Sequence, residues 1–302
     1  MSQLFEPVQI LGLNFKNRVV MAPMTRSRAP DAQPNDLMAT YYGQRSEAGL
    51  IITEGTSPSP HGLGYSRIPG LFNHQHVQGW KKSVDAVHAD GGKIFIQLMH
   101  AGRVSHPLNM PANSRILAPS AVRLTGTMWT DQKAMQPYPV PQAMTENEVE
   151  FAIHEFVQSA RLARDAGFDG VEIHGANGYL VEQFLNAASN HRTDRFGGSI
   201  ENRIRFAVTI AEKMVQAIGR ERVGMRISPY GVFNDMTSDS DTDELFKALV
   251  QALSKIGIAY IHVVDHESMG APSVPLKIKQ MIRAEFKGTY ILSGGYDRAR
   301  AE

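Results

Sequence analysis

The sequence predicts a (β/α)8 TIM barrel, and three observations support this fold class. A strand followed by a helix recurs along the 302 residues, which is the pattern of a parallel sheet covered by helices. Several of these strands are almost continuously apolar, as expected where both faces of a sheet are buried. No strand is followed by a G-x-G-x-x-G motif, because Gly62 and Gly64 lie in a loop without a third glycine. An open doubly wound sheet is therefore the less favoured alternative.

The first three strand and helix units are expected before residue 101. The stretch VVMAPMT predicts a strand over 19–25, and a helix over 36–47 separates it from a strand over 50–56. A helix over 75–90 then leads into a strand over 93–100. The segment 101–144 departs from the pattern and is rich in Pro, Ser, Asn and Thr. Loops of this length are usually functional, so we expect a small hairpin cap here.

The second half of the chain resumes the alternation. Thr145 and Glu148 form the sequence pattern of a capping box, and the helix that they start ends at Gly167. Residues 170–180, GVEIHGANGYL, form a strand that runs into a turn. Further helices are expected over 200–218, 242–256 and 275–286, and further strands over 223–229, 260–265 and 289–295. The sequence ends at Glu302, so we expect one barrel domain over 1–302 whose C-terminal βα unit is absent from this sequence.

Composition restricts the classes of function. The chain is 42% hydrophobic and carries a formal net charge of +1, which leaves no basic excess for nucleic acid or an anionic membrane. It has no cysteine, so thiolate nucleophiles and sulfur-ligated metals are excluded. No secretory signal is visible, and no apolar run approaches the ~20 residues of a membrane span. We therefore expect a cytoplasmic protein with no nucleic-acid or membrane partner.

The turn after the strand at 170 carries the strongest functional signal. Strand periodicity places His174 at the carboxyl end, and Gly175 and Gly178 let the backbone bend so that His174 and Asn177 point at one ligand atom. A single histidine near a turn is more often structural. Together with the phenol of Tyr179, however, these residues predict a site that holds and protonates an oxygenated substrate.

In a barrel, functional residues gather at the carboxyl ends of the strands. The residues expected there suit a flat, hydrogen-bonding heterocycle with a phosphate tail better than a metal ion. They are Pro23, Met24, Thr25, Glu54, Gly55, Gln97, Met99, His100, Arg226, Ser293, Gly294 and Gly295.

Several of these stretches resemble one known family in the right order over essentially the whole chain. VVMAPMT, TEGT, HGANGYL with QFLN, HRTDRFGGSIENRIRF, GMRISP and SGGYD are similar to landmarks of the old yellow enzyme family of FMN-dependent ene-reductases. The resemblance implies a barrel that binds FMN and is reduced by NADPH or NADH. The implied substrates are small activated alkenes such as enones, enals, maleimides and nitroalkenes.

The resemblance also implies a role for individual residues. His174 and Asn177 would bind the substrate's carbonyl or nitro oxygen, and Tyr179 would be the proton donor. Met99 and Tyr65 would line the substrate pocket. The residues that would bind FMN are Pro23, Met24, Thr25, Gly55, Gln97, Arg226, Ser293, Gly294 and Gly295. Arg226 also makes independent sense there, because a fixed guanidinium favours the anionic reduced flavin.

Two features depart from the family pattern. Many members carry a Trp where this chain has Met99, so we expect a wider substrate pocket and an altered stereochemical preference. The absent eighth βα unit leads us to expect weak FMN binding by this chain alone.

Two other classes of function remain open from the residues alone. A metal-dependent barrel hydrolase or lyase would use His100, His174, His262, Asp265 and His266, and a non-catalytic truncated barrel would use none of them. The charged run from 191 to 206 is expected to be framework, with Ser199 as a helix cap. The assembly is expected to be a monomer or a homodimer.

Overall fold

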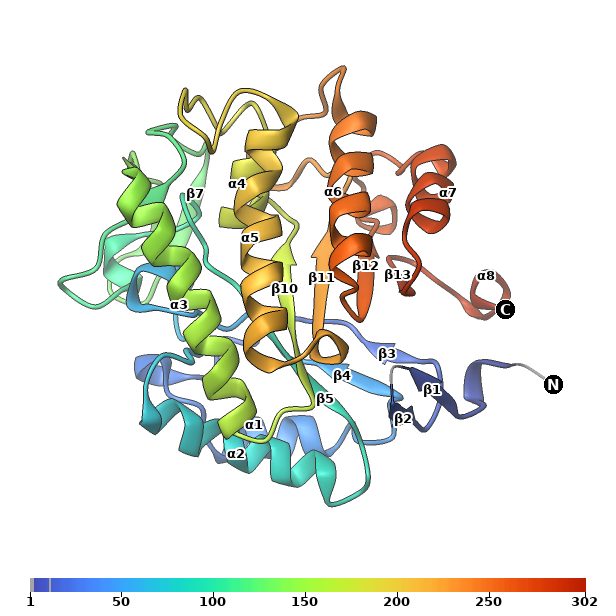
Figure 1. Ribbon diagram of the computed structural model, residues 1–302. Helices are drawn as coiled ribbons and strands as arrows, with labels where there is room; N and C mark the ends of the chain where they lie inside the picture. Colours follow the sequence, from blue (N-terminus) through green and yellow to red (C-terminus); the bar gives the residue numbers. More distant parts are fainter. Residues whose placement is uncertain (1–2, 11) are drawn as a thin grey trace.

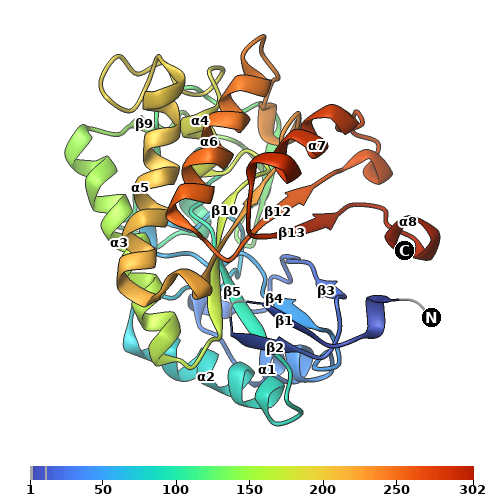
Figure 2. The ribbon, with the colours of Figure 1, turned by 45° about the vertical axis from the view of Figure 1, so that its right-hand side comes forward.

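A seven-stranded parallel sheet forms the centre of the computed structural model, which describes residues 3–10 and 12–302 (Figure 1). Its strand order is β13-β12-β11-β10-β5-β4-β3, and the sheet curls so that its two edge strands approach the same side of the molecule (Figure 2). The strands are β3 (Val20–Met21), β4 (Leu50–Ile52), β5 (Ile94–Leu98), β10 (Gly170–Gly175), β11 (Val223–Ile227), β12 (Tyr260–Val264) and β13 (Thr289–Ser293).

Helices cover the outer face of this sheet. In Figure 1, α3, α5, α6 and α7 stand side by side along it, while α1 and α2 cover the end near β4 and β5. The helices are α1 (Asp36–Gly43), α2 (His74–His88), α3 (Glu146–Asp165), α4 (Leu180–Leu185), α5 (Ile200–Ile218), α6 (Thr242–Ile256), α7 (Leu276–Glu285) and α8 (Arg298–Ala301). The alternation of strands and helices predicted from the sequence is therefore present in this chain.

Local signals define several of these helices. Thr145 and Glu148 form a complete capping box at the start of α3, and the Ser199 side chain accepts a hydrogen bond from the Asn202 N–H at the start of α5. Helix α6 ends at Gly257 in the left-handed conformation, which glycine adopts without steric cost. The predicted bounds of α5 and α6 are confirmed, and these two cap residues directly adjoin the helices that they bound.

The first two predicted strands are too long. The prediction of a strand over 19–25 is wrong after Met21, since Pro23 has no N–H to donate to a ladder. Strand β4 ends at Ile52 instead of continuing to 56. The Thr53 and Thr56 N–H groups donate to the carbonyls of Phe95 and Gln97, respectively, on the neighbouring strand β5. Three residues on one side thus match two on the other, which is a bulge.

The segment 101–144 contains an antiparallel hairpin of β7 (Thr127–Thr130) and β8 (Ala134–Pro137). Two short strands, β6 (Leu117–Ala118) and β9 (Gln142–Ala143), pair in parallel beside it. A second hairpin, of β1 (Val8–Ile10) and β2 (Leu13–Phe15), was not predicted from the sequence.

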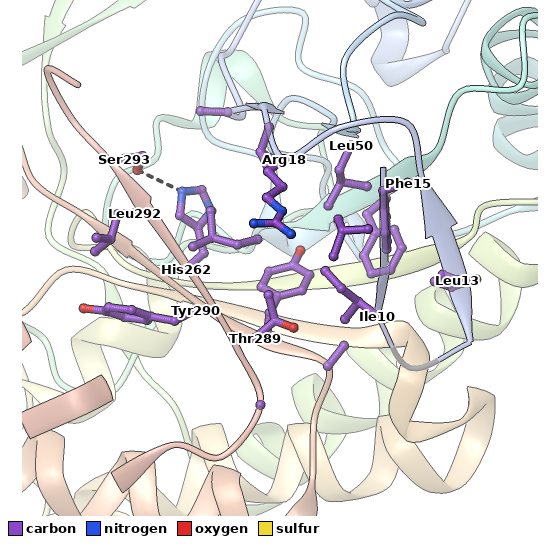
Figure 3. A pocket seen from close by; sticks show the side chains of 18 of the residues that line it. Ile10, Leu13, Phe15, Arg18, Leu50, His262, Thr289, Tyr290, Leu292 and Ser293 are labelled. Carbon is purple, nitrogen blue, oxygen red and sulfur yellow. Dashed lines mark hydrogen bonds between the residues drawn. The ribbon is translucent and has the colours of Figure 1, made fainter. Parts of the chain in front are cut away.

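A cavity of about 540 Å³ lies between the β1-β2 hairpin and strands β12 and β13 (Figure 3). Ile10, Leu13 and Phe15 line one side, and Tyr290 and Leu292 line the other. Of the residues predicted for the functional site, only Ser293 borders this cavity. No helix in the described part of the chain is long and apolar enough to cross a membrane.

Candidate active site at the carboxyl ends of the strands

The turn after β10 is held rigid by its own hydrogen bonds. Asn177 and Gly178 both have positive φ, 61° and 75°, which Asn and Gly tolerate better than other residues. The Asn177 N–H donates to Ser228 Oγ over 2.9 Å, and the Gly178 N–H donates to Glu182 Oε2 over 2.6 Å. Ser228 Oγ in turn donates to Glu182 Oε1 over 2.8 Å, and Asn234 Nδ2 donates to the Asn177 carbonyl over 2.7 Å. The backbone of Asn177 is therefore held on both sides, through its N–H and its carbonyl, before any ligand binds.

His174 is a neutral hydrogen-bond donor at the end of β10. Its Nδ1 accepts a bond from the Ala176 N–H over 3.3 Å, so the ring proton is on Nε2. Burial, reinforced by the charge of Arg226, holds the pKa of His174 well below its ordinary value. Asn177 Oδ1 is buried and has no partner among the described residues. Both side chains thus keep polar groups available to a ligand.

Tyr179 lies directly beside His174. The two rings meet edge to face with their centroids 4.8 Å apart, and the Tyr179 hydroxyl is 2.9 Å from the hydroxyl of Tyr65. Burial raises the pKa of Tyr179, so its phenol keeps its proton at neutral pH. The structure therefore brings together the four residues His174, Asn177, Tyr179 and Tyr65 that the sequence singled out.

Gln97 and Arg226 lie on the strands that flank β10. Arg226 pairs in register with His174, and its Nε is buried without a partner in the described part of the chain. Gln97 donates its Nε2 hydrogen to Glu172 over 2.7 Å, while its Oε1 accepts no hydrogen bond from any described residue. The barrel interior beside the turn thus presents an unpaired guanidinium nitrogen and an unpaired amide oxygen.

Met99 packs against Gly55 at the end of β5. It is only 1% exposed and shares an apolar cluster with Tyr65 and Tyr179. A Cβ on Gly55 would lie 2.6 Å from the Met99 sulfur, so only glycine fits beneath this side chain. Met99 is therefore next to the two tyrosines, and a pocket widened by it stays a prediction.

Two further groups of predicted residues lie on loops. Pro23, Met24 and Thr25 follow β3 in an irregular segment in which Met24 is 48% exposed. After β13, Gly294 has a φ of 115°, and a Cβ there would lie 1.7 Å from the Asp265 carbonyl oxygen. The N–H groups of Gly294 and Gly295 donate to no other described residue. Backbone donors of this kind suit an anionic group.

Known proteins are similar to this chain in sequence and in fold. Residues 3–302 match the family described as NADH:flavin oxidoreductase / NADH oxidase. A probable flavin mononucleotide-dependent alkene reductase from Leishmania infantum is 45% identical over 266 residues, which are 86% of this chain and 73% of that protein. The 12-oxophytodienoate reductase 7 of Oryza sativa subsp. japonica is 38% identical, with 98% of this chain and 79% of that protein covered.

The chain belongs to the NADH:flavin oxidoreductase family.

The fold of this chain matches solved structures of the family over nearly its whole length. Morphinone reductase matches with a TM-score of 0.94 at 40% identity, covering 98% of this chain and 81% of that one. An old yellow enzyme homologue from Zymomonas mobilis matches with a TM-score of 0.93 at 37% identity, covering 98% and 83%. The resemblance to the old yellow enzyme family is therefore confirmed, and the curled sheet of this family member has the TIM-barrel fold.

Sequence reasoning missed the residues that hold the site together. Ser228, Glu182 and Asn234 fix the turn, yet they lie on other elements and no motif ties them to it. Glu172 was recognised only as part of the strand pattern. A charged residue in an otherwise apolar strand was the one signal that could have pointed to it.

The charged run from 191 to 206 is framework in part as predicted. Asn202 ties its helix to the turn through the carbonyls of Asp194 and Gly197, but Arg195 forms ion pairs with Glu146 and Glu150 of α3 instead. Arg195 therefore joins the turn before α5 to helix α3. Within the described ranges, no group of three or more His, Asp or Glu side chains is placed to hold a metal ion.

Proposed function

We propose that this family member is an FMN-dependent ene-reductase that is reduced by NADPH or NADH and saturates the carbon–carbon double bond of a small activated alkene. The single observation that carries the proposal is the buried constellation of Tyr179, neutral His174 and Asn177 next to Arg226. The flavin mononucleotide named for the Leishmania relative, and the tetrahydroNAD bound in a morphinone reductase structure, support the same cofactor and reductant.

The unpaired polar groups of the chain fit FMN. Gln97 Oε1 is an acceptor for an N–H of the ring system, and Arg226 supplies a cation for the ring edge that becomes anionic on reduction. The N–H groups of Gly294 and Gly295 are donors for the phosphate. We assign Pro23, Met24, Thr25, Gly55 and Ser293 to the same cofactor site. When bound, FMN supplies the hydride.

The residues of the turn handle the substrate oxygen and the proton. His174 Nε2–H and the Asn177 Nδ2–H would both donate to the carbonyl or nitro oxygen, which makes the β-carbon a better hydride acceptor. Because His174 stays neutral, it donates a hydrogen bond without giving up a proton. Tyr179 holds its proton until it is delivered to the α-carbon. Met99 and Tyr65 complete the pocket.

We also infer that the segment 101–144 covers this site within a single barrel domain over 1–302. Val104, Leu124, Met128 and Tyr138 form an apolar cluster against which Tyr65 and Tyr179 pack. This apolar cluster therefore holds the hairpin segment against the site and also packs against Tyr179, the proton donor.

Visible spectroscopy tests this function directly. The purified protein reconstituted with FMN is expected to show flavin absorption that bleaches on anaerobic addition of NADPH or NADH and returns when an enone is added. Comparison of the two nucleotides then gives the preferred reductant. A protein that takes up no FMN, or whose bleached flavin does not respond to enone, maleimide or nitroalkene, would contradict the proposal.

A further inference from the structure

A buried carboxylate lies beneath the predicted flavin-binding residues and has no role in the chemistry described so far. Glu172 is fully buried in β10, where its Oε1 accepts a hydrogen bond from Gln97 Nε2 over 2.7 Å and its Oε2 accepts one from His262 Nδ1 over 2.9 Å. These two donors offset the cost of burying the carboxylate, because an unpaired carboxylate at this position would strongly destabilise the fold.

The protonation states of Glu172 and His262 fix which atom donates in each hydrogen bond between Ser293, His262 and Glu172. Burial opposes ionisation of Glu172, but the hydrogen bond from His262 and the positive charge of Arg226 hold its pKa below the ordinary value, so it is ionised. An ionised carboxylate only accepts, so the His262 proton is on Nδ1 and its Nε2 accepts from Ser293 Oγ over 2.8 Å (Figure 3). Burial lowers the pKa of His262, which leaves this ring neutral. The net charge contributed by Glu172 and His262 is therefore −1.

The neighbouring strand is shaped to permit this contact. Glu172 and His262 lie on β10 and β12, with β11 between them, and the β11 residue in register with Glu172 is Gly224. A Cβ on Gly224 would lie 2.2 Å from the Tyr260 ring, so the absent side chain leaves room for Tyr260. The position beside Glu172 on the middle strand thus carries no side chain between β10 and β12.

We propose that Glu172 is a positioning residue that orients the Gln97 amide and balances the charge of Arg226, and so sets how strongly the site prefers reduced over oxidised FMN. Because Gln97 Nε2 is committed to Glu172, the amide cannot flip, and its Oε1 is the atom presented to the cofactor. Arg226 favours the anionic reduced flavin, and the negative charge of Glu172 reduces that preference. This inference rests on the proposed binding of FMN.

Glu172→Gln tests the charge while keeping the shape. The new amide oxygen can still accept from Gln97 Nε2, and the amide N–H can donate to His262 Nδ1 once the ring proton moves to His262 Nε2, which then donates to Ser293 Oγ. The fold is therefore expected to be kept, and the affinity for oxidised FMN to change less than threefold. The affinity ratio of reduced to oxidised FMN is expected to rise at least tenfold, which equals an increase of about 30 mV in the two-electron potential. Spectroelectrochemical titration of the full chain measures it, with circular dichroism to verify folding.

Asp169→Asn is the matched control. Asp169 is a buried carboxylate just before the other end of the same strand, where it pairs with His88 and Lys93 at 2.8 Å each. Its loss is expected to lower stability without moving the flavin potential. A second test for orientation is the pair Glu172→Ala and Gln97→Ala, whose effects on oxidised FMN affinity are expected to be strongly non-additive.

The outcomes separate this inference from the proposed function. An unchanged potential in Glu172→Gln, an equal shift in Asp169→Asn, or additive losses in the double mutant would each overturn the role of Glu172. A wild-type chain that takes up no FMN would overturn the proposed function instead. In that case, ¹⁵N NMR still tests the hydrogen bond from His262 Nδ1 to Glu172. A His262 ring protonated on Nε2 instead of Nδ1 at pH 7 would refute this bond.

Discussion

Replacing Tyr179 by Phe isolates the proton-transfer step of the proposed reaction. The substitution removes one hydroxyl and keeps the ring, so the edge-to-face contact with His174 at 4.8 Å remains. It also breaks the 2.9 Å hydrogen bond to Tyr65, whose hydroxyl is left in a buried site. The substitution thus has two effects, a chemical one on the rate of proton transfer and a structural one on folding stability, and they differ in free energy.

The chemical part is expected to be much the larger. A positioned general acid accelerates a reaction by about 10² to 10⁴, which corresponds to about 3 to 5 kcal/mol in the activation free energy. The structural part is one broken hydrogen bond with its partner left buried, which costs about 1 to 3 kcal/mol of folding stability. Reduction of the flavin by NADPH needs no phenolic proton and should stay within threefold of wild type.

Tyr65→Phe provides the matched control, because it breaks the same hydrogen bond from the other side and leaves the Tyr179 phenol in place. Both variants should lose similar stability in urea unfolding, but Tyr179→Phe should slow reoxidation by an enone far more than Tyr65→Phe, which keeps the phenol of the proton donor. Anaerobic stopped-flow measurement of the two half-reactions separates these effects. Full-speed reoxidation in Tyr179→Phe, or an equal loss in Tyr65→Phe, would refute the assignment of the proton donor to Tyr179.

Three further predictions address the same site. His174→Ala and Asn177→Ala should each weaken binding of a phenol, which imitates the substrate oxygen, by about 1 to 3 kcal/mol, as measured from its charge-transfer band with FMN; unchanged affinities would place the pair elsewhere. Met99 already packs closely on Gly55, where an added Cβ would lie 2.6 Å from the Met99 sulfur. The larger indole of Met99→Trp should therefore enter the pocket and change the enantiomer ratio for a β-substituted enone in chiral chromatography; an identical ratio would remove Met99 from the pocket. Burial raises the pKa of Glu182 from 4.5 to about 7, so the folded state favours the protonated carboxyl. The contribution of this protonation to folding stability is complete below about pH 4.5 and is lost as the pH rises through 7. Glu182→Gln should therefore unfold at higher urea than wild type at pH 8, by up to about 3 kcal/mol, and the difference should vanish near pH 4.5; a pH-independent difference would mean that Glu182 does not titrate in this range.

The sequence by itself determined the elements whose signals are local. The capping box at Thr145 fixed the start of α3, and the apolar periodicity of α5 and α6 fixed helices that need no distant partner to be recognised. The turn with His174, Asn177 and Tyr179 was also readable, because its residues lie within six positions of one another and two glycines mark the bend. Such features are encoded by spacing along the chain, which is all that one sequence displays.

Only the tertiary structure decided which residues support that turn and what lies beneath it. Tyr65 meets Tyr179 across 114 positions, and Glu172 meets His262 across 90, over a glycine on the intervening strand. The first strand stops at Met21, and a bulge at Glu54 and Gly55 ends the second, because backbone donors there find partners outside a regular ladder. The physical reason is common to all these cases. Curling of the sheet brings distant side chains within hydrogen-bonding distance. Burial then makes each unpaired polar group costly, so a partner is selected by its position in space, whatever its position in the chain.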